Sequence, residues 1–158
     1  MGKIIYEKGD LVKRTDINIF VHQCNCFGTM GAGIAKQIAT TYPEAAKADR
    51  SYMNERGSLG IFGTILPVKL SDGRICVNMY SQYHYGKGKQ TDSEAFKSCL
   101  KQLIRYTDYL NPDLKIGFPK LIGCGLAGGD WNEIEKYLET FAGLVKNPVY
   151  IIDFAEAD

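Results

Sequence analysis

The sequence predicts an α/β fold of three layers (α/β/α), with a central mixed β-sheet between helices on both faces. The first observation behind this prediction is alternation: short apolar segments of strand length are followed by longer segments whose apolar residues recur at helical spacing. The second is the Asp72–Gly73 dipeptide between two strand-like segments, which is typical of a tight hairpin. Alternation favours parallel strands joined by helices, and a hairpin adds an antiparallel strand, so a mixed sheet is expected.

The expected strands are short apolar segments set off by glycine, proline, asparagine or aspartate. In chain order they are residues 3–7, 17–22, 63–70, 74–80, 115–119 and 148–154. Residues 17–22 are apolar enough to be buried on both faces of a sheet. Gly57 and Gly60 indicate a turn, and residues 81–90, which are polar and aromatic, are expected to form a loop.

The expected helices have an apolar face and a residue at their start that suits a helix terminus. Pro43 is tolerated in the first turn of a helix. Thr91 or Asp92 is expected to cap a long helix, and Asp130 is well placed to cap the last one. The four segments are residues 34–42, 44–55, the stretch between 92 and 111, and 131–145.

Length and charge restrict the class of protein. A chain of 158 residues is expected to form one domain, spanning 1–158. Its 19 basic and 18 acidic side chains leave a net charge of +1, so the large basic excess of a protein that coats nucleic acid is absent. No apolar run approaches the roughly 20 residues of a membrane span, and the start does not resemble a secretory leader. We expect a cytoplasmic protein with no membrane partner.

The cysteines and histidines argue against disulfides and metals. Five cysteines, an odd number with no C-x-x-C pair, do not fit a disulfide framework or a zinc ribbon. Two histidines far apart, with no carboxylate at ligand spacing, predict no metal site. Cys24, Cys26 and Cys124 are interpreted as small buried packing groups, because a nucleophilic thiolate needs a basic neighbour. Reduced thiols in a cytosol fit best.

Glycine is concentrated in two loops, each between an apolar strand and a helix. Seven of the 17 glycines lie in residues 24–33 and 123–130. Ligands of open α/β sheets bind beyond the carboxyl ends of parallel strands, so both loops are expected to face one crevice. Glycine lets backbone N–H groups approach an anion, and a helix N-terminus adds a favourable dipole. We expect the two loops to grip a diphosphate from opposite sides.

Neither glycine loop matches the two best-known nucleotide-binding patterns. The P-loop pattern G-x-x-x-x-G-K-[ST] is absent from the sequence. The glycines of residues 28–33 are out of order for the Rossmann fingerprint, and no acidic residue ends a second strand about 20 residues later. The sequence therefore disfavours nicotinamide redox chemistry, and no cofactor is expected.

Four motifs in this order resemble the macrodomain family, whose members bind ADP-ribose. The motifs are Lys8-Gly9-Asp10-Leu11, Val21-His22-Gln23-Cys24-Asn25, Met30-Gly31-Ala32-Gly33-Ile34-Ala35 and Gly123-Cys124-Gly125-Leu126-Ala127-Gly128-Gly129-Asp130-Trp131. The resemblance covers residues 3–154, and the family's mixed sheet between helices agrees with the expected layers. It implies a cleft that binds ADP-ribose or ADP-ribose 1″-phosphate.

The resemblance implies roles for single residues. Asp10, beside Leu11, corresponds to the aspartate that contacts the adenine amino group, and Asn25 to the asparagine at the distal ribose. Phe154 is expected to pack against adenine. The implied contacts in the glycine loops are Gly31, Ala32, Gly33 and Ile34 at the distal ribose and phosphate, and Gly123, Cys124, Gly125, Leu126 and Ala127 at the diphosphate. Alternatives stay open, with Asp10 as a turn or cap residue, Asn25 in an Asx-turn and Phe154 in the core.

The resemblance also suggests an activity. His22 stands where many macrodomains carry asparagine, which is similar to the branch that hydrolyses ADP-ribose 1″-phosphate. A histidine with a near-neutral pKa exchanges protons at physiological pH, so His22 is the first catalytic candidate and His84 the second. Asp130 is a candidate for orienting water or His22. The alternatives are that His22 is a core histidine, that His84 is exposed on a loop and that Asp130 is a helix cap.

Two other activities stay open. One branch of the family removes ADP-ribose from glutamate or nucleic-acid bases with a lysine and an aspartate. Gln82 and Ala127 stand at those positions here, so such an activity would need Lys87 or Lys89 instead. The other alternative is a reader that binds ADP-ribose, free or attached to protein or nucleic acid, without turnover.

Overall fold

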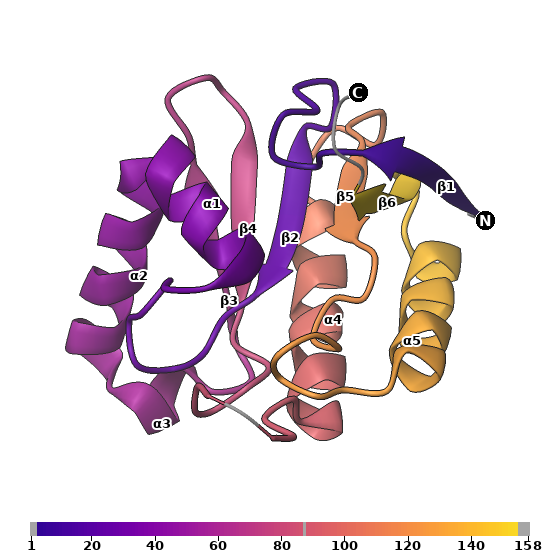
Figure 1. The fold of residues 1–158 in the computed structure, drawn as a ribbon. Helices are drawn as coiled ribbons and strands as arrows, with labels where there is room; N and C mark the ends of the chain where they lie inside the picture. Colours follow the sequence, from indigo (N-terminus) through magenta and orange to yellow (C-terminus); the bar gives the residue numbers. More distant parts are fainter. Residues whose placement is uncertain (1–2, 87, 155–158) are drawn as a thin grey trace.

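The computed structural model describes residues 3–86 and 88–154 of the chain. Figure 1 shows a twisted sheet in the middle with helices on either side. The strands are β1 (Ile4–Gly9), β2 (Ile19–Gln23), β3 (Ile65–Lys69), β4 (Ile75–Met79), β5 (Ile116–Pro119) and β6 (Val149–Phe154). The helices are α1 (Gly33–Thr41), α2 (Pro43–Arg56), α3 (Ser58–Ile61), α4 (Ser93–Thr107) and α5 (Trp131–Leu144).

The sheet is mixed, as predicted. Its strand order is β1-β6-β5-β2-β4-β3. Every neighbouring pair is parallel except β3 and β4, the two strands of the predicted hairpin. Gly73 takes the positive φ of 89° that the turn requires, and the Asp72 carboxylate accepts a hydrogen bond from the Arg74 N–H at 3.0 Å. The three-layer α/β/α prediction is therefore confirmed.

β2 holds the two outer layers together because it is buried on both faces. Ile19 packs in the core that contains Phe96 of α4 and Phe141 of α5. The next residue, Phe20, packs in a second core with Ile38 of α1. Successive residues of a strand point to opposite faces, so α4 and α5 cover one face and α1 and α2 the other (Figure 1).

α3 differs from the turn that was expected at Gly57 and Gly60. Gly57 does end α2, with a φ of 78° and its N–H donating to the Met53 carbonyl at 2.7 Å. The following residues then form one helical turn that buries Ile61. A segment of this length has no helical repeat in its apolar residues, so the sequence pattern gave no sign of it.

The other expected helices and strands are all present, with ends that differ by a few residues from the expected ones. Within residues 3–86 and 88–154, no helix has the length and apolar character needed to cross a membrane. The parallel direction of β1, β2, β4, β5 and β6 brings their carboxyl ends to one edge of the sheet. The loops that leave this edge build the site described next.

Candidate functional site

A cavity of about 900 Å³ lies at the carboxyl ends of the parallel strands. Both glycine loops line it, with Gly31 on the first and Gly125 on the second, so the two loops share one cleft as predicted. The loop after β4 also lines it, through Gln82, Tyr85 and Gly86. This is the position at which open α/β sheets bind their ligands.

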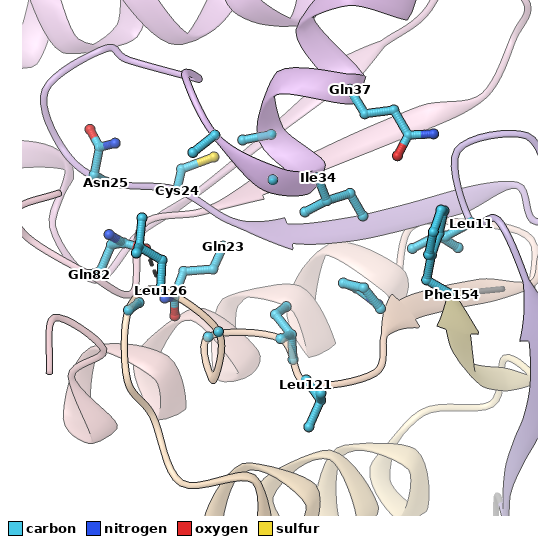
Figure 2. A pocket seen from close by; sticks show the side chains of 18 of the residues that line it. Leu11, Gln23, Cys24, Asn25, Ile34, Gln37, Gln82, Leu121, Leu126 and Phe154 are labelled. Atoms are coloured by element: carbon cyan, nitrogen blue, oxygen red, sulfur yellow. Dashed lines mark hydrogen bonds between the residues drawn. The ribbon is translucent and has the colours of Figure 1, made fainter. Parts of the chain in front are cut away.

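The two ends of the cavity carry different side chains (Figure 2). Leu11, Gln37 and Phe154 lie at one end, which we name the Phe154 end. Asn25 and Gln82 lie at the other, which we name the Asn25 end. A ligand that fills the cavity therefore meets the apolar side chains of Leu11 and Phe154 at one end and two carboxamides at the other.

Asp10 lies at the Phe154 end and is held by Gln37 of α1. The Gln37 Nε2 group lies 3.0 and 2.9 Å from the two carboxylate oxygens of Asp10 and donates to them. The Val12 N–H donates to Oδ1 of the same carboxylate at 3.1 Å, which is the turn role that was the alternative for Asp10. An ionised carboxylate has about four acceptor sites, so Asp10 keeps capacity for an amine of the ligand.

The two apolar residues predicted at this end both line the cavity but differ in exposure. Leu11 is buried, whereas Phe154 is 63% exposed. The alternative that Phe154 is a core residue is therefore wrong. A large exposed ring at the rim of a cavity is a surface on which a flat apolar ligand group packs.

The first glycine loop is braced by Asn25. Its Nδ2 donates to the carbonyl oxygen and the hydroxyl of Thr29, both at 2.9 Å, and its Oδ1 accepts from the Phe27 N–H at 2.9 Å. Asn25 thus has the turn role that was the alternative, and it lines the cavity as well. α1 begins at Gly33 with a φ of 56° and has no side-chain cap. The positive end of the helix dipole faces the cavity wall, where it favours an anion.

The second glycine loop folds back on itself. Gly123 and Gly128 both have a φ of 73°, and the Gly129 N–H donates to the Gly123 carbonyl at 2.8 Å. A Cβ at Gly129 would lie 2.6 Å from that oxygen, so only glycine fits. The predicted residues of this loop that line the cavity are Gly123, Gly125, Leu126 and Ala127. Cys124 does not, because its thiol donates to the Ile122 carbonyl at 3.4 Å and packs against the core.

Comparison with known proteins agrees with this geometry. The family model named Macro domain matches residues 21–138. The chain belongs to the macrodomain family. The ADP-ribose 1″-phosphate phosphatase of Saccharomyces cerevisiae is 33% identical to this macrodomain in an alignment 176 positions long, which covers 95% of this chain and 99% of the yeast protein.

Mycobacterium tuberculosis provides two further similarities. Its DNA ADP-ribosyl glycohydrolase is 29% identical to this macrodomain over 136 residues, which cover 85% of this chain and 37% of that longer protein. The solved macrodomain of its DarG protein has a TM-score of 0.82 at 28% identity, and the match covers 96% of this chain and 98% of that one. The layers and strand order of Figure 1 are therefore those of a macrodomain.

The predicted catalytic histidines do not line the cavity of this macrodomain. His22 is fully buried, and its Nε2 lies 2.7 Å from the Asn78 Oδ1. Burial lowers the pKa of His22 to about 4, so the ring is neutral near pH 7. His84 is exposed, and its ring packs on Phe27 with centroids 4.6 Å apart. The structure places the first in the core and the second on a surface loop, the roles that were their alternatives.

Asp130 is also outside the cavity wall. It is the N-cap of α5, and its Oδ1 accepts a hydrogen bond from the Asn132 N–H at 2.9 Å. Cap residues of this kind satisfy backbone N–H groups that the helix itself leaves unpaired. The three predicted catalytic side chains therefore do not converge on the cavity.

The positions that matter for a lysine-dependent activity are neutral here. Gln82 lines the Asn25 end, and Ala127 lines the cavity from the second loop. Lys89 is not among the residues on the cavity wall. Lys87 lies outside the described residues. Among residues 3–86 and 88–154, no group of histidine, cysteine, aspartate and glutamate is placed to hold a metal ion.

The thiols beside the first loop are protonated at neutral pH. Cys24 lines the cavity, and its Sγ lies 3.4 Å from the His22 Nε2. Burial raises the pKa of Cys24 well above its ordinary value and that of Cys26 to about 12. The neighbouring histidine is itself hard to protonate, so it does not stabilise a thiolate. The interpretation of these cysteines as packing groups agrees with the structure.

Several polar residues of the wall were not predicted. Gln23 and Gln82 line the cavity where the loops after β2 and β4 meet, and Gln37 lines its other end. Gln37 follows Ile34 by three positions on α1, so the two share a helix face, and this spacing is a signal that could have found it. Gln23 ends a buried strand at the sheet edge where ligands bind, which is a weaker signal.

Proposed function

We propose that this macrodomain binds ADP-ribose in the cavity and hydrolyses ADP-ribose 1″-phosphate to ADP-ribose and inorganic phosphate. The observation that supports this most is that two glycine loops line one cavity, between the Phe154 end with its Asp10 carboxylate and the Asn25 end with its carboxamides. The adenine base, the diphosphate and the distal ribose of ADP-ribose require partners in that order along the cavity. The similarity to the yeast phosphatase, which extends over almost all of both chains, favours the same substrate.

Each part of the ligand has a proposed partner. The adenine amino group donates to Asp10, and the base packs between Leu11 and Phe154. The diphosphate lies against the start of α1 and the second glycine loop, where backbone N–H groups and the helix dipole favour an anion. The distal ribose lies at the Asn25 end, within reach of the Asn25 and Gln82 carboxamides.

Hydrolysis of the phosphate monoester needs a positioned water, stabilisation of the equatorial oxygens and a proton for the leaving oxygen. Both N–H groups of Asn25 already donate to Thr29, so the first two needs are assigned to the Gln82 carboxamide and to backbone N–H groups at the Asn25 end. His22, His84 and Asp130 do not line the cavity, so the proposal assigns no proton transfer to their side chains. The attacking water forms a new P–O bond as the bond between phosphorus and the 1″ oxygen breaks, and the proton that this water releases neutralises the leaving oxygen. Turnover then depends on how accurately the Asn25 end holds the 1″-phosphate.

Two measurements test the proposal. Titration calorimetry with ADP-ribose should show binding that Asp10→Ala weakens, because the amine loses its acceptor. Phosphate release from ADP-ribose 1″-phosphate should be catalytic in the wild type, with kcat lowered in Asn25→Ala and KM raised in Asp10→Ala. Binding without phosphate release would leave a reader of ADP-ribose. Absence of binding at millimolar ADP-ribose would contradict both functions.

Removal of ADP-ribose from nucleic acid or protein is the second candidate function. Its support is the similarity to the mycobacterial glycohydrolase and to the DarG macrodomain. Release of labelled ADP-ribose from a modified oligonucleotide or protein, compared between wild type and Lys89→Ala, distinguishes it from the phosphatase.

All five cysteines are unpaired, which supports a reducing, cytoplasmic location for either activity.

A further inference from the structure

We propose that Gln23 is a positioning residue that fixes the second glycine loop and the Asn25 end in one arrangement, an inference that rests on the proposed binding of ADP-ribose. Gln23 is the last residue of β2, and it lies on the cavity wall beside Gln82 (Figure 2). It is therefore placed where the loops that follow three different strands come together.

The Gln23 carboxamide uses all its hydrogen-bonding groups on neighbouring loops. Its Nε2 donates to the Gln82 Oε1 and to the Thr91 Oγ1, both at 2.9 Å. Its Oε1 accepts from the Ser81 hydroxyl at 2.6 Å. A carboxamide has two N–H donors and one oxygen, so this side chain has one hydrogen-bonded orientation in the structure.

Thr91 connects the Gln23 carboxamide to the second glycine loop. Thr91 is 5% exposed, and its hydroxyl donates to the Gly123 carbonyl at 2.6 Å, the same oxygen that accepts from the Gly129 N–H. A Cβ at Gly123 would lie 2.9 Å from the Gln23 Oε1 and 3.1 Å from the Thr91 Oγ1. The first peptide of the loop thus rests directly on Gln23 and Thr91, which set where the following backbone N–H groups lie.

Gln82 carries the link to the Asn25 end. Its Oε1 accepts from Gln23, and its Nε2 donates to the His84 carbonyl at 2.8 Å. The far side of the same loop is joined to the second glycine loop, since the Gln90 N–H donates to the Ala127 carbonyl at 2.7 Å. Loops ordered in this way before the ligand arrives lower the entropic cost of binding.

The Phe154 end is held by other residues. Gln37 fixes Asp10 there, and Gln23 has no hydrogen bond to either. Loss of the Gln23 carboxamide should therefore weaken the binding of ligands that reach the second glycine loop and the Asn25 end more than that of ligands that fill only the Phe154 end. This selectivity is the signature of positioning, because a general loss of stability affects all ligands of the folded state alike.

The test compares ADP-ribose with AMP by titration calorimetry. Gln23→Met keeps the length of the side chain and removes its hydrogen bonds. We expect the Kd for ADP-ribose to rise about tenfold while that for AMP changes by less than about twofold. Thr91→Val should show the same selectivity, and its matched control Thr91→Ser, which keeps the hydroxyl, should bind both ligands like the wild type.

The outcomes separate this inference from the proposed function. A wild type that binds neither ADP-ribose nor AMP overturns both. A wild type that binds both, with an ADP-ribose to AMP ratio of Kd values unchanged in Gln23→Met or, if that variant does not fold, in Thr91→Val, overturns only the role of Gln23. The variant that combines Gln23→Met with Thr91→Val gives a further measurement. If its Kd for ADP-ribose rises by less than the product of the two single increases, the role of Gln23 is supported, because the two residues then act through the same hydrogen bonds.

Discussion

Leu121 lies on the cavity wall in a left-handed backbone conformation, with a φ of 65°. This conformation costs a residue with a side chain about 1–2 kcal/mol. Leu121→Gly removes that cost but gives the unfolded chain about 0.5–1 kcal/mol more backbone entropy, so the glycine variant should be about 0.5 kcal/mol more stable than Leu121→Ala, which loses the same burial. Binding of ADP-ribose should weaken, since the ligand loses an apolar contact. Denaturant unfolding and calorimetry measure the two effects.

Leu121→Ala is the matched control for this opposition between stability and binding. Alanine keeps the strained backbone but lacks the side chain, so it should weaken binding with no gain in stability. The side chain of Leu121 is 50% exposed, so both variants lose the same partial burial, and the difference in stability between them isolates the backbone. Equal losses of stability in the glycine and alanine variants would contradict the interpretation.

Gln37 offers the complementary test at the Phe154 end. Gln37→Leu removes both hydrogen bonds that orient the Asp10 carboxylate. We expect the Kd values for ADP-ribose and AMP to rise together, by about fivefold, because both ligands carry the adenine amine. Gln37→Glu should be worse, since it sets a like charge against Asp10. An AMP affinity equal to that of the wild type in Gln37→Leu would show that Asp10 does not need this support.

At the residue scale, most residues predicted to bind the ligand line the cavity, whereas the three predicted catalytic side chains do not. Asp10 and Asn25 were found because their motifs resemble a family, and each has both its predicted place and its alternative turn role. His22 was not placed correctly, because whether a polar residue at a strand end is buried depends on the helix that covers it. Here it lies in the core beside Asn78, a contact across strands that local sequence does not encode.

At the scale of elements, Arg74 fixes the segment that follows β1 against the sheet. Arg74 is 4% exposed, and its guanidinium donates to the carbonyl oxygens of Leu11, Val12 and Ile17 at 3.0, 2.6 and 2.9 Å. It also lies over the Phe20 ring, 4.3 Å from the centroid. One side chain thus satisfies three buried carbonyls of the segment that carries the Phe154 end of the cavity.

Arg74→Met should lower the free energy of unfolding by about 3 kcal/mol, because three carbonyls lose their donor while the apolar volume is kept. Arg74→Lys should lose less, since it keeps the charge, but its single ammonium does not reproduce the fork of donors. Urea unfolding at neutral pH measures both. A methionine variant as stable as the wild type would mean that water replaces the guanidinium at these carbonyls.

The elements themselves were largely predictable, because each has a local cause. Asp72–Gly73 gave the hairpin, and the unbroken apolar run at 17–22 indicated a strand buried on both faces, as Ile19 and Phe20 of β2 are. α3 was missed because one turn carries no repeat. Strand order was not predicted, since the adjacency of β1 and β6 joins the two ends of the chain, and no local pattern encodes such a pairing.

At the scale of the whole molecule, the cavity lies where five parallel strands, β1, β6, β5, β2 and β4, end at one edge of the sheet. Its general location was predictable from the two glycine loops, since fold topology fixes where such loops gather. The glutamines of its wall were not predicted: Gln82 stands there through tertiary contacts, and Gln37 and Gln23 offered only the spacing and strand-end signals described above. The loops that line the cavity are thus joined by residues far apart in the sequence.

The stability of the whole molecule should depend on pH through His22. Burial lowers its pKa to about 4 in the folded state, against an ordinary value of 6.5. Between these values the unfolded chain binds a proton that the folded chain excludes, so the free energy of unfolding should fall as the pH drops from about 6.5 towards 4. The full effect is on the order of 3 kcal/mol. Above pH 6.5 both states are neutral at His22, and this contribution is constant.

A His22→Gln variant isolates this effect, because glutamine keeps a polar partner for Asn78 and does not titrate. Between pH 7 and pH 5 its free energy of unfolding should lose the decline seen in the wild type. Asp49, buried in the same region, has a raised pKa because of burial, and its proton uptake in the folded state acts in the opposite direction. The variant should therefore become flat or slightly more stable towards pH 5. Urea unfolding at each pH measures this, and an unchanged decline would place its source elsewhere. ADP-ribose affinity at pH 7 should stay at the wild-type value, since His22 does not line the cavity.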